Sequence, residues 1–274
     1  MDIKNLGLQC VGLVAGFAAV LCGEYASADK MEETPEKGLR VLLVYGGGHH
    51  SPITPYMRML DSMPGVDWTP ALLPQSNNML KPGLEKEYDV LLMVQMMGSR
   101  WKEAEFSPEQ RKAFADLLHK GIGIVALHQA LATEPDWTES PRIFGGAWRN
   151  EAYEIDGHKY AESGCLHNTD IRVFAANPKH PIVQGVPEFV INDEVYLDIY
   201  KAADNVPILV TDHPQANGRK EIAWTRSYGN SNVFYFQLGH VPEQTWNRPD
   251  CRRIVRQAIM WAAEKSKKPT DKNE

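Results

Sequence analysis

Histidine and amide side chains follow several apolar segments of this chain, each at the point where the segment ends. They are His128 and Gln129 after "GIVAL" (123–127), Gln95 at the end of "DVLLMVQ" (89–95), and His240 two residues after "NVFYFQL" (232–238). An imidazole titrates near neutral pH, so it can take up or release a proton during a reaction, and it is also a common zinc ligand. These positions therefore predict a site for acid–base or metal chemistry.

A glycine-rich turn adds a further group of such residues. Gly47, Gly48, His49 and His50 follow the apolar segment "RVLLVY" (40–45). The glycines indicate a tight turn or a loop that contacts a ligand, but the segment is no phosphate-binding P-loop, because the Lys-Ser/Thr pair is absent. A single histidine after a strand often only packs, so the evidence for a site is the convergence of several such groups.

An acidic motif is the third feature that could do chemistry. The segment "NDEVY" (192–196) reads as a strand, in which successive side chains point to opposite faces. Glu194 and Tyr196 are therefore expected to point together into one space, which Asp193 cannot share. The alternative is that these residues form a solvated edge strand.

The elements that must position these groups alternate between strand and helix. The pattern predicts strands over 40–45, 68–73, 89–95 and 123–127, with a helix over 52–63 and another between Ser107 and Gly121. The second helix has an N-cap at Ser107, a capping box with Gln110 and a terminating glycine at Gly121. Parallel strands need crossover connections, so this order predicts a parallel sheet with helices on both faces and a ligand site at its carboxyl edge.

The second half of the chain is richer in strands. They are predicted over 152–155, 170–175, 190–200, 207–211, 221–225 and 232–238, and a last helix over 249–264. No repeat or linker divides residues 39–265. We therefore predict one α/β domain, built as a three-layer, doubly wound, mostly parallel sheet with extra strands in its second half.

The first 28 residues read as a secretory signal peptide. An apolar run over 6–22 is followed by the small residues of 26–28, which resemble a cleavage position. A membrane anchor is the alternative, but the A-x-A tripeptide favours cleavage, after which no stable membrane insertion is expected. We predict a periplasmic or secreted protein with a polar tether over 29–38 and a disordered tail over 266–274.

Composition limits the partners. The net charge is −6, and aromatic residues are not interleaved with Arg or Lys, so nucleic acid is not expected as a partner. Without the leader the chain keeps Cys165 and Cys251, which an oxidising compartment could join, and the sequence does not decide whether they pair. It does not fix an oligomeric state either.

Five ordered motifs resemble those of the ThuA-like (trehalose utilisation) proteins. They are "GIVALHQA" (123–130), "FGGAW" (144–148), "HPIVQGV" (180–186), "NDEVY" (192–196) and "VFYFQLGHVPEQTW" (233–246), and the resemblance covers about residues 39–264. It implies the fold of the class I glutamine amidotransferases, which is similar to that of flavodoxin. It also implies a histidine near the site at about the position of His158.

The resemblance gives the position of His128 a chemical meaning. In the amidotransferase pattern the turn after this strand carries a nucleophilic cysteine, and a late His-Pro-Glu supplies the base and its orienting carboxylate. This chain has His128 at the first place and His240-Val241-Pro242-Glu243, with one residue inserted, at the second. An imidazole cannot form the thioester that glutamine hydrolysis needs, so glutaminase activity is excluded.

An enzyme that acts on a carbohydrate is the first hypothesis. The resemblance implies pathways that pass through 3-keto derivatives of disaccharides, whose carbonyl acidifies the neighbouring C–H bonds. His128 or His240 would serve as the base, with Glu194 orienting it, and His50 or an N–H of Gly47 or Gly48 would donate to the enolate oxygen. Trp224 could supply an apolar platform for a sugar ring, or could pack the core.

Two other hypotheses use the same residues. His128, His240 and Glu194 could be the ligands of zinc or another divalent ion in a sugar hydrolase or isomerase, although the sequence has no local ligand spacing such as H-x-x-x-H. A secreted sugar-binding module without turnover is the third hypothesis. It would have little use for histidines at the strand ends.

Overall fold

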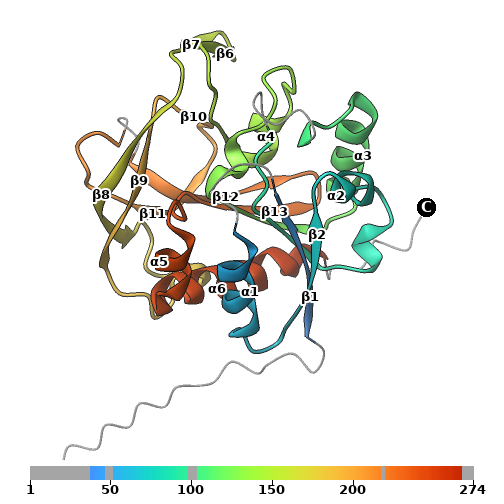
Figure 1. Cartoon of the computed structure of the whole chain (residues 1–274), viewed down its shortest axis with the longest axis horizontal. Coiled ribbons are helices and arrows are strands. Elements are labelled where there is room, and N and C mark those ends of the chain that lie inside the picture. The colour runs from blue at the N-terminus through green and yellow to red at the C-terminus, as the bar shows by residue number, and fades with distance from the viewer. Residues whose placement is uncertain (1–37, 47–51, 98–103, 217–219, 267–274) are drawn as a thin grey trace, which may run out of the picture. The chain divides into compact units, whose positions relative to one another are not determined.

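A nine-stranded sheet forms the centre of the domain (Figure 1). The computed structural model describes residues 38–46, 52–97, 104–216 and 220–266. In sheet order the strands are β2 (Val66–Leu72), β1 (Leu39–Tyr45), β3 (Val90–Met93), β4 (Gly123–Leu127), β13 (Ser231–Phe236), β12 (Glu221–Tyr228), β11 (Val206–Val210), β8 (Gly164–Ala175) and β9 (Phe189–Leu197). The first five run parallel, whereas β12, β11, β8 and β9 extend the sheet by antiparallel pairing.

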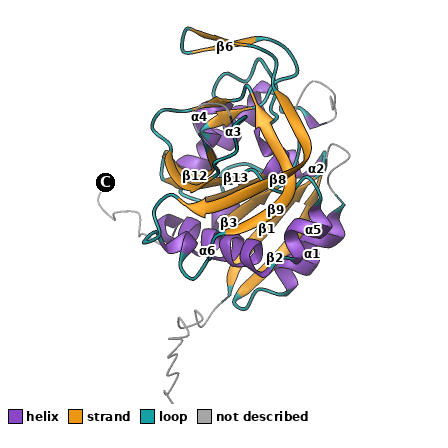
Figure 2. Ribbon diagram, turned by 90° about the vertical axis from the view of Figure 1, so that its left-hand side faces the viewer, coloured by secondary structure: helices purple, strands orange, loops and turns teal. Residues whose placement is uncertain are grey.

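Helices cover both faces of this sheet (Figure 2). One face carries α1 (Ile53–Asp61), α5 (Pro242–Asn247) and α6 (Pro249–Ser266), and the other carries α3 (Pro108–His119) and α4 (Ser140–Phe144). Short elements complete the described chain: α2 (Gln75–Met79), η1 (Leu84–Lys86), η3 (His128–Leu131) and η4 (Pro181–Val183), with the strand pairs β5 (Gly146–Ala147) with β10 (Tyr200–Lys201) and β6 (Tyr153–Ile155) with β7 (His158–Tyr160). The predicted three-layer α/β architecture is confirmed.

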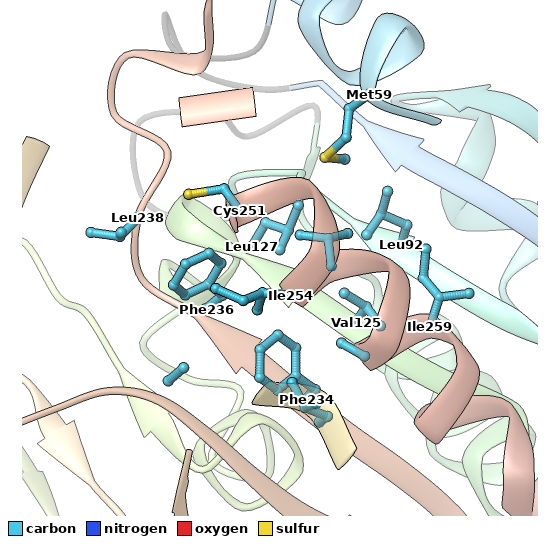
Figure 3. Packing of buried hydrophobic residues seen from close by; sticks show 14 of the residues in the cluster. Met59, Leu92, Val125, Leu127, Phe234, Phe236, Leu238, Cys251, Ile254 and Ile259 are labelled. Carbon is cyan, nitrogen blue, oxygen red and sulfur yellow. The ribbon is translucent and has the colours of Figure 1, made fainter. Parts of the chain in front are cut away.

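Two hydrophobic cores explain why the central strands are apolar throughout. Along β4, Val125 and Leu127 pack under α6, while Ile124 and Ala126 belong to the core on the opposite face. Figure 3 shows the first of these cores, in which α6 lies over β4 and β13; its labelled residues include Val125, Leu127, Phe234, Phe236, Cys251, Ile254 and Ile259. A strand buried on both faces needs apolar residues at every position, so it shows no alternation in the sequence.

The cap of α3 forms as its residues predict. The Ser107 hydroxyl accepts a hydrogen bond from the Gln110 N–H at 3.2 Å, and the Gln110 side chain accepts one from the Ser107 N–H at 2.9 Å. Gly121 follows the helix with a φ of +93°, a region that favours glycine. Local signals therefore fix both ends of this helix and the start of β4.

Two local expectations need correction. The predicted strand over 170–175 begins at Gly164, so β8 also contains His167, and His158, which no predicted strand contained, lies on β7. The helix α5 has no counterpart in the prediction. The sequence left the pairing of Cys165 and Cys251 open, and in the structure both cysteines are free. Within the described ranges, no helix combines the length and apolarity needed to span a bilayer.

A buried carboxyl group ties the loop after η3 to the start of α3. Glu134 is 1% exposed, and its Oε1 accepts a hydrogen bond from the Phe106 N–H at 2.6 Å. Burial raises the pKa of Glu134 above its ordinary 4.5, and the hydrogen bonds from N–H groups only partly oppose this.

We expect this group to make the protein less stable as pH rises. The folded state holds the Glu134 proton more tightly than the unfolded state, so its contribution is complete below the unfolded pKa and is lost as pH rises through the higher folded value. Relative to the wild type, the unfolding free energy of Glu134→Gln should therefore increase as the pH rises above the unfolded pKa of the carboxyl group, as measured by urea titration. A constant difference between the two proteins would contradict the shift.

Candidate active site

Three distant segments of the chain meet beyond the carboxyl ends of β4 and β13. These two strands are parallel neighbours, with Leu127 opposite Phe236, so the residues that follow them leave the sheet at the same edge. His128 follows β4 directly and Gly239-His240 follow β13, while Glu194 comes from β9. The Glu194 carboxylate contacts the rings of both histidines.

His128 is held in an unusual backbone conformation. Its φ is +48°, in the left-handed region that costs a non-glycine residue roughly 1–3 kcal/mol. Two contacts fix the residue there: the Tyr235 hydroxyl donates to the His128 carbonyl oxygen at 2.8 Å, and the imidazole Nδ1 lies 2.8 Å from the Gln237 carbonyl oxygen. Strain of this kind, maintained by surrounding contacts, is common at functional positions.

The contact with Gln237 also decides which ring nitrogen of His128 carries the proton. A carbonyl oxygen can only accept a hydrogen bond, so Nδ1 is the donor and the lone pair of the neutral ring is on Nε2. Nε2 lies 3.4 Å from Oε2 of Glu194. The ring is 2% exposed, so this lone pair faces the carboxylate in a nearly dry environment.

Glu194 is the centre of the site, because three imidazoles surround its carboxylate. His128 Nε2 and His240 Nδ1 each lie 3.4 Å from Oε2, and His167 Nδ1 lies 3.2 Å from Oε1. We call these four residues the three-histidine cluster. Burial raises the pKa of Glu194, while the Cys165 thiol and the nearby His167 oppose the rise. A buried carboxylate needs cationic or hydrogen-bonding neighbours, and the cluster supplies them.

Asp193 fixes the backbone on which the cluster is built. Its buried carboxylate accepts hydrogen bonds from the N–H groups of Glu194 (2.8 Å), Gly239 (3.1 Å) and His240 (3.1 Å), and from the Thr245 hydroxyl (2.8 Å). It therefore ties β9 to the loop after β13 and to α5. As predicted from strand alternation, Asp193 does not share the space of Glu194 and Tyr196, and the Tyr196 hydroxyl lies 3.1 Å from His128 Nδ1.

His167 and Cys165 were missed as members of the site. They are two residues apart on β8, so they point to the same face, and Cys165 lies opposite Tyr196 of β9. His167 Nδ1 is 3.1 Å from His240 Nε2, and its Nε2 is 3.4 Å from the Cys165 sulfur. Burial, with the adjacent Glu194, raises the pKa of Cys165 to about 12, so its thiol is not a nucleophile at neutral pH. Extending the predicted strand to Gly164 would have revealed the pair.

The remaining predicted residues are placed differently. Gly47, Gly48, His49 and His50 lie outside the described residues. Gln95 and Gln129 are both buried after their strands, and the Gln129 amide donates to the Val94 carbonyl oxygen at 2.7 Å.

Trp224 and His158 lie apart from the cluster. Trp224 is fully buried, donates its indole N–H to the Phe144 carbonyl oxygen at 2.9 Å and packs on Tyr235 with ring centroids 4.5 Å apart. Its ring thus packs the core and offers no face to a sugar, contrary to the suggested platform. His158 is exposed on the β6–β7 hairpin, which projects from the body of the domain (Figure 1). Among the described residues, no contact joins it to the three-histidine cluster.

Glu243, the late acidic residue of the amidotransferase pattern, does not lie in the three-histidine cluster. Glu243 is half exposed on α5 and forms an ion pair with Arg58 at 3.4 Å. The carboxylate beside His240 is Glu194, which comes from β9. With an imidazole at position 128, the arrangement can transfer protons or bind a cation, but it cannot form a thioester.

Gly239 allows the late loop to pass close to His128. Its φ is +136°, and a Cβ there would lie 2.9 Å from Trp246 Cζ2 and 3.2 Å from His128 Cβ. We expect Gly239→Ala to cost about 2 kcal/mol or more of unfolding free energy and to displace the His128 ring, which lowers activity.

Gly157 is the matched control, because it has a φ of +77° but no atom within 4 Å of its Cβ position. Gly157→Ala should cost only the backbone strain, about 1–2 kcal/mol, and should leave the site unchanged. Denaturant titration and an activity assay on both variants test this. Equal activity of the two variants would show that Gly239 does not hold His128 in place.

Comparisons with known proteins agree with this architecture. A family model described as "ThuA: Trehalose utilisation" matches residues 40–262. A search of curated proteins found no match.

Solved structures show the same fold at low sequence identity. A ThuA-like protein from Parabacteroides merdae has a TM-score of 0.64 and 18% identity, with 83% of this chain and 91% of that chain covered. A ThuA-like protein from Bacteroides uniformis has a TM-score of 0.60 and 17% identity, covering 83% and 92%. PurLQS from Thermotoga maritima has a TM-score of 0.52 and 13% identity, covering 82% and 99%.

Proposed function

Because this chain belongs to the ThuA (trehalose utilisation) family, we propose that it is an enzyme that acts on a keto sugar. The expected substrate class is a 3-keto disaccharide. The reaction begins with abstraction of a proton from the carbon next to the carbonyl. The observation that carries the proposal is the three-histidine cluster, in which imidazoles converge on one buried carboxylate where the amidotransferase pattern has a thiol.

The proton transfer can be written with the groups of the cluster. A neutral imidazole takes the proton from carbon, the C–H electron pair forms the new C=C bond, and the carbonyl π electrons move to oxygen, which becomes an enolate. Returning the proton to the former carbonyl carbon, while the hydroxyl proton of the neighbouring carbon moves to the enolate oxygen, gives isomerisation. Loss of a β-substituent gives elimination. His128 and His240 are the proposed bases and Glu194 orients them; His167, whose side chain is 51% exposed, is the most accessible ring of the three.

The enolate oxygen needs a hydrogen-bond donor. His50 and the N–H groups of Gly47 and Gly48 remain the predicted donors, and they lie outside the described residues. Trp224 has no part in this scheme, because its ring is buried in the core.

Deuterium exchange is the sharpest test of the proposal. The protein is incubated in D₂O with 3-keto-trehalose and other oxidised disaccharides, and mass spectrometry follows both deuterium uptake at carbon and product formation. Unoxidised trehalose is the matched control, because it lacks a carbonyl and should not exchange. Enzyme-dependent deuterium uptake by a keto sugar is the expected result.

Two other outcomes would overturn the proposal. If the sugars bind but neither exchange nor turnover is found, the protein is a sugar-binding module. If no sugar of the panel binds at all, the substrate class is wrong. His128→Ala separates the first case from catalysis, because an enzyme should lose turnover while keeping sugar affinity.

We also propose that the protein works in the periplasm or outside the cell. The support is the leader pattern of residues 1–28, which lies outside the described residues. Expressed with its leader in a bacterial host, the protein should appear in the periplasmic fraction with Asp29 as its N-terminal residue. An uncleaved cytoplasmic product would contradict this.

A further inference from the structure

Donor atoms of His128, Glu194 and His240 lie within 4.8 Å of one another in the three-histidine cluster. We infer that His128 Nε2, His240 Nδ1 and the Glu194 carboxylate bind one divalent transition-metal ion, for which zinc suits the donor set. The inference concerns the site of the proposed function and takes its catalytic meaning from that function. Metal binding itself does not depend on the identity of the sugar.

Distances between the donor atoms fit a single ion. One atom from each of the three residues lies within 4.8 Å of the other two, and both imidazole contacts to Glu194 Oε2 measure 3.4 Å. With bonds of about 2.0–2.2 Å, two ligands of a tetrahedral zinc ion lie about 3.3–3.6 Å apart. The contacts to Glu194 are therefore as long as the edges of a zinc tetrahedron and longer than strong charge-assisted hydrogen bonds, which measure about 2.7–2.9 Å.

The fixed proton of His128 strengthens this assignment. Because Nδ1 donates to the Gln237 carbonyl oxygen, a neutral His128 turns the Nε2 lone pair toward a carboxylate oxygen. Two lone pairs in contact repel each other unless a cation lies between them. A histidine whose second nitrogen donates to a backbone carbonyl is also the usual form of a metal-bound imidazole.

A second imidazole contacts the same carboxylate oxygen, because both His128 Nε2 and His240 Nδ1 lie 3.4 Å from Glu194 Oε2. Protons would join these groups in two separate hydrogen bonds, one from an imidazolium at His128 and one from the Nδ1–H of a neutral His240. A single divalent ion accepts all three lone pairs at one centre. Nitrogen and oxygen donors of this kind suit zinc and its first-row neighbours better than calcium or magnesium, which prefer oxygen.

The surroundings resemble a site built for an ion with an open position. Asp193 fixes the backbone of Glu194 and His240, and the Gln237 side chain donates to the Glu194 carbonyl oxygen at 3.1 Å. His128 and Glu194 are buried, whereas the His240 side chain is 17% exposed, so the site opens on its His240 side. Three protein ligands with one accessible position are typical of catalytic rather than structural zinc.

Metal binding would also give the three imidazoles different roles. If His128 and His240 hold the ion, they no longer serve as the bases named in the proposed function, and the ion would hold the substrate carbonyl oxygen. His167 would then be the imidazole left to take the proton, because its side chain is 51% exposed and it is not in this ligand set. The chemical class of ligand is thus a keto sugar whose carbonyl oxygen coordinates the ion.

Metal uptake without substrate tests the inference. Purified protein is stripped with a chelator, dialysed and titrated with Zn²⁺, and bound metal is measured by elemental analysis. We expect about one ion per chain, a higher melting temperature with Zn²⁺, and visible absorption bands of tetrahedral Co²⁺ when Co²⁺ replaces it. His240→Ala and the nearly isosteric Glu194→Gln should each weaken binding by about 100-fold or more.

His213→Ala is the matched control, because His213 lies in a turn after β11 and its ring accepts a hydrogen bond from the Gln215 N–H. It should bind Zn²⁺ as the wild type does. No uptake by the stripped wild type, or uptake that survives in both His240→Ala and Glu194→Gln, would overturn the inference. Circular dichroism checks that Glu194→Gln is folded, so that lost binding reports on the ligand.

Sugar measurements keep this inference separate from the proposed function. A protein that binds one Zn²⁺ but neither exchanges nor converts any keto sugar would retain the metal site and refute the enzyme. A metal-free protein that turns over a keto sugar at the full rate would retain the proposed enzyme and refute a catalytic metal.

Discussion

His128→Ala is expected to lower turnover of a keto sugar by about 10²- to 10⁴-fold while the protein remains folded. The imidazole is fixed by the Gln237 carbonyl oxygen and faces Glu194, so its removal leaves the buried carboxylate without one of its three partners. The loss should appear in kcat more than in sugar affinity, because the His128 side chain is 2% exposed, whereas those of His240 and His167 are 17% and 51% exposed. Steady-state kinetics and equilibrium sugar binding measure the two effects separately.

His128→Gly is the matched partner of this variant. Both substitutions remove the imidazole, but only glycine adopts the φ of +48° without strain. His128→Gly should therefore be more stable than His128→Ala by about 1 kcal/mol, although both should lose turnover to the same extent. Turnover near the wild-type rate in either variant would remove His128 from the mechanism, and equal stabilities would mean that position 128 stores no strain.

The second large effect is expected at Asp193. Its carboxylate, 1% exposed, accepts hydrogen bonds from three N–H groups and the Thr245 hydroxyl. Asp193→Ala leaves four buried donors without an acceptor, and at roughly 1 kcal/mol each the unfolding free energy should fall by about 3–5 kcal/mol. The loop that carries His240 should also loosen, so activity should fall together with stability.

Asp170→Ala is the control for that variant. Asp170 is an exposed carboxylate on β8 that accepts a hydrogen bond from Asn192, the residue before Asp193, at 2.9 Å. Its loss should change stability by about 0.5 kcal/mol or less. Urea titration of both variants measures the contrast, and a similar small effect at the two positions would show that Asp193 does not organise the loop.

Local signals were sufficient for most of the fold. The capping box of Ser107 and Gln110 fixed the start of α3, and the alternation of strands with helices indicated a parallel sheet with two covered faces. The predicted ends of strands were wrong where polar and apolar residues do not alternate regularly. The first half of β8, from Gly164, carries Cys165, His167 and Asn168, and no strand was predicted there because exposed strand residues need not be apolar.

The sequence by itself determined the parallel sheet of the first half with its covering helices, the replacement of a thiol by His128, and the alternation that separates Glu194 from Asp193. These depend on residue type and on neighbours within a few positions. Only the tertiary structure decided which groups share one space: it moved Glu243 to the surface, buried Trp224 and brought His167 from β8 onto Glu194. The reason is physical, because burial, protonation and contact depend on segments far apart in the chain, and no local pattern records where those segments meet.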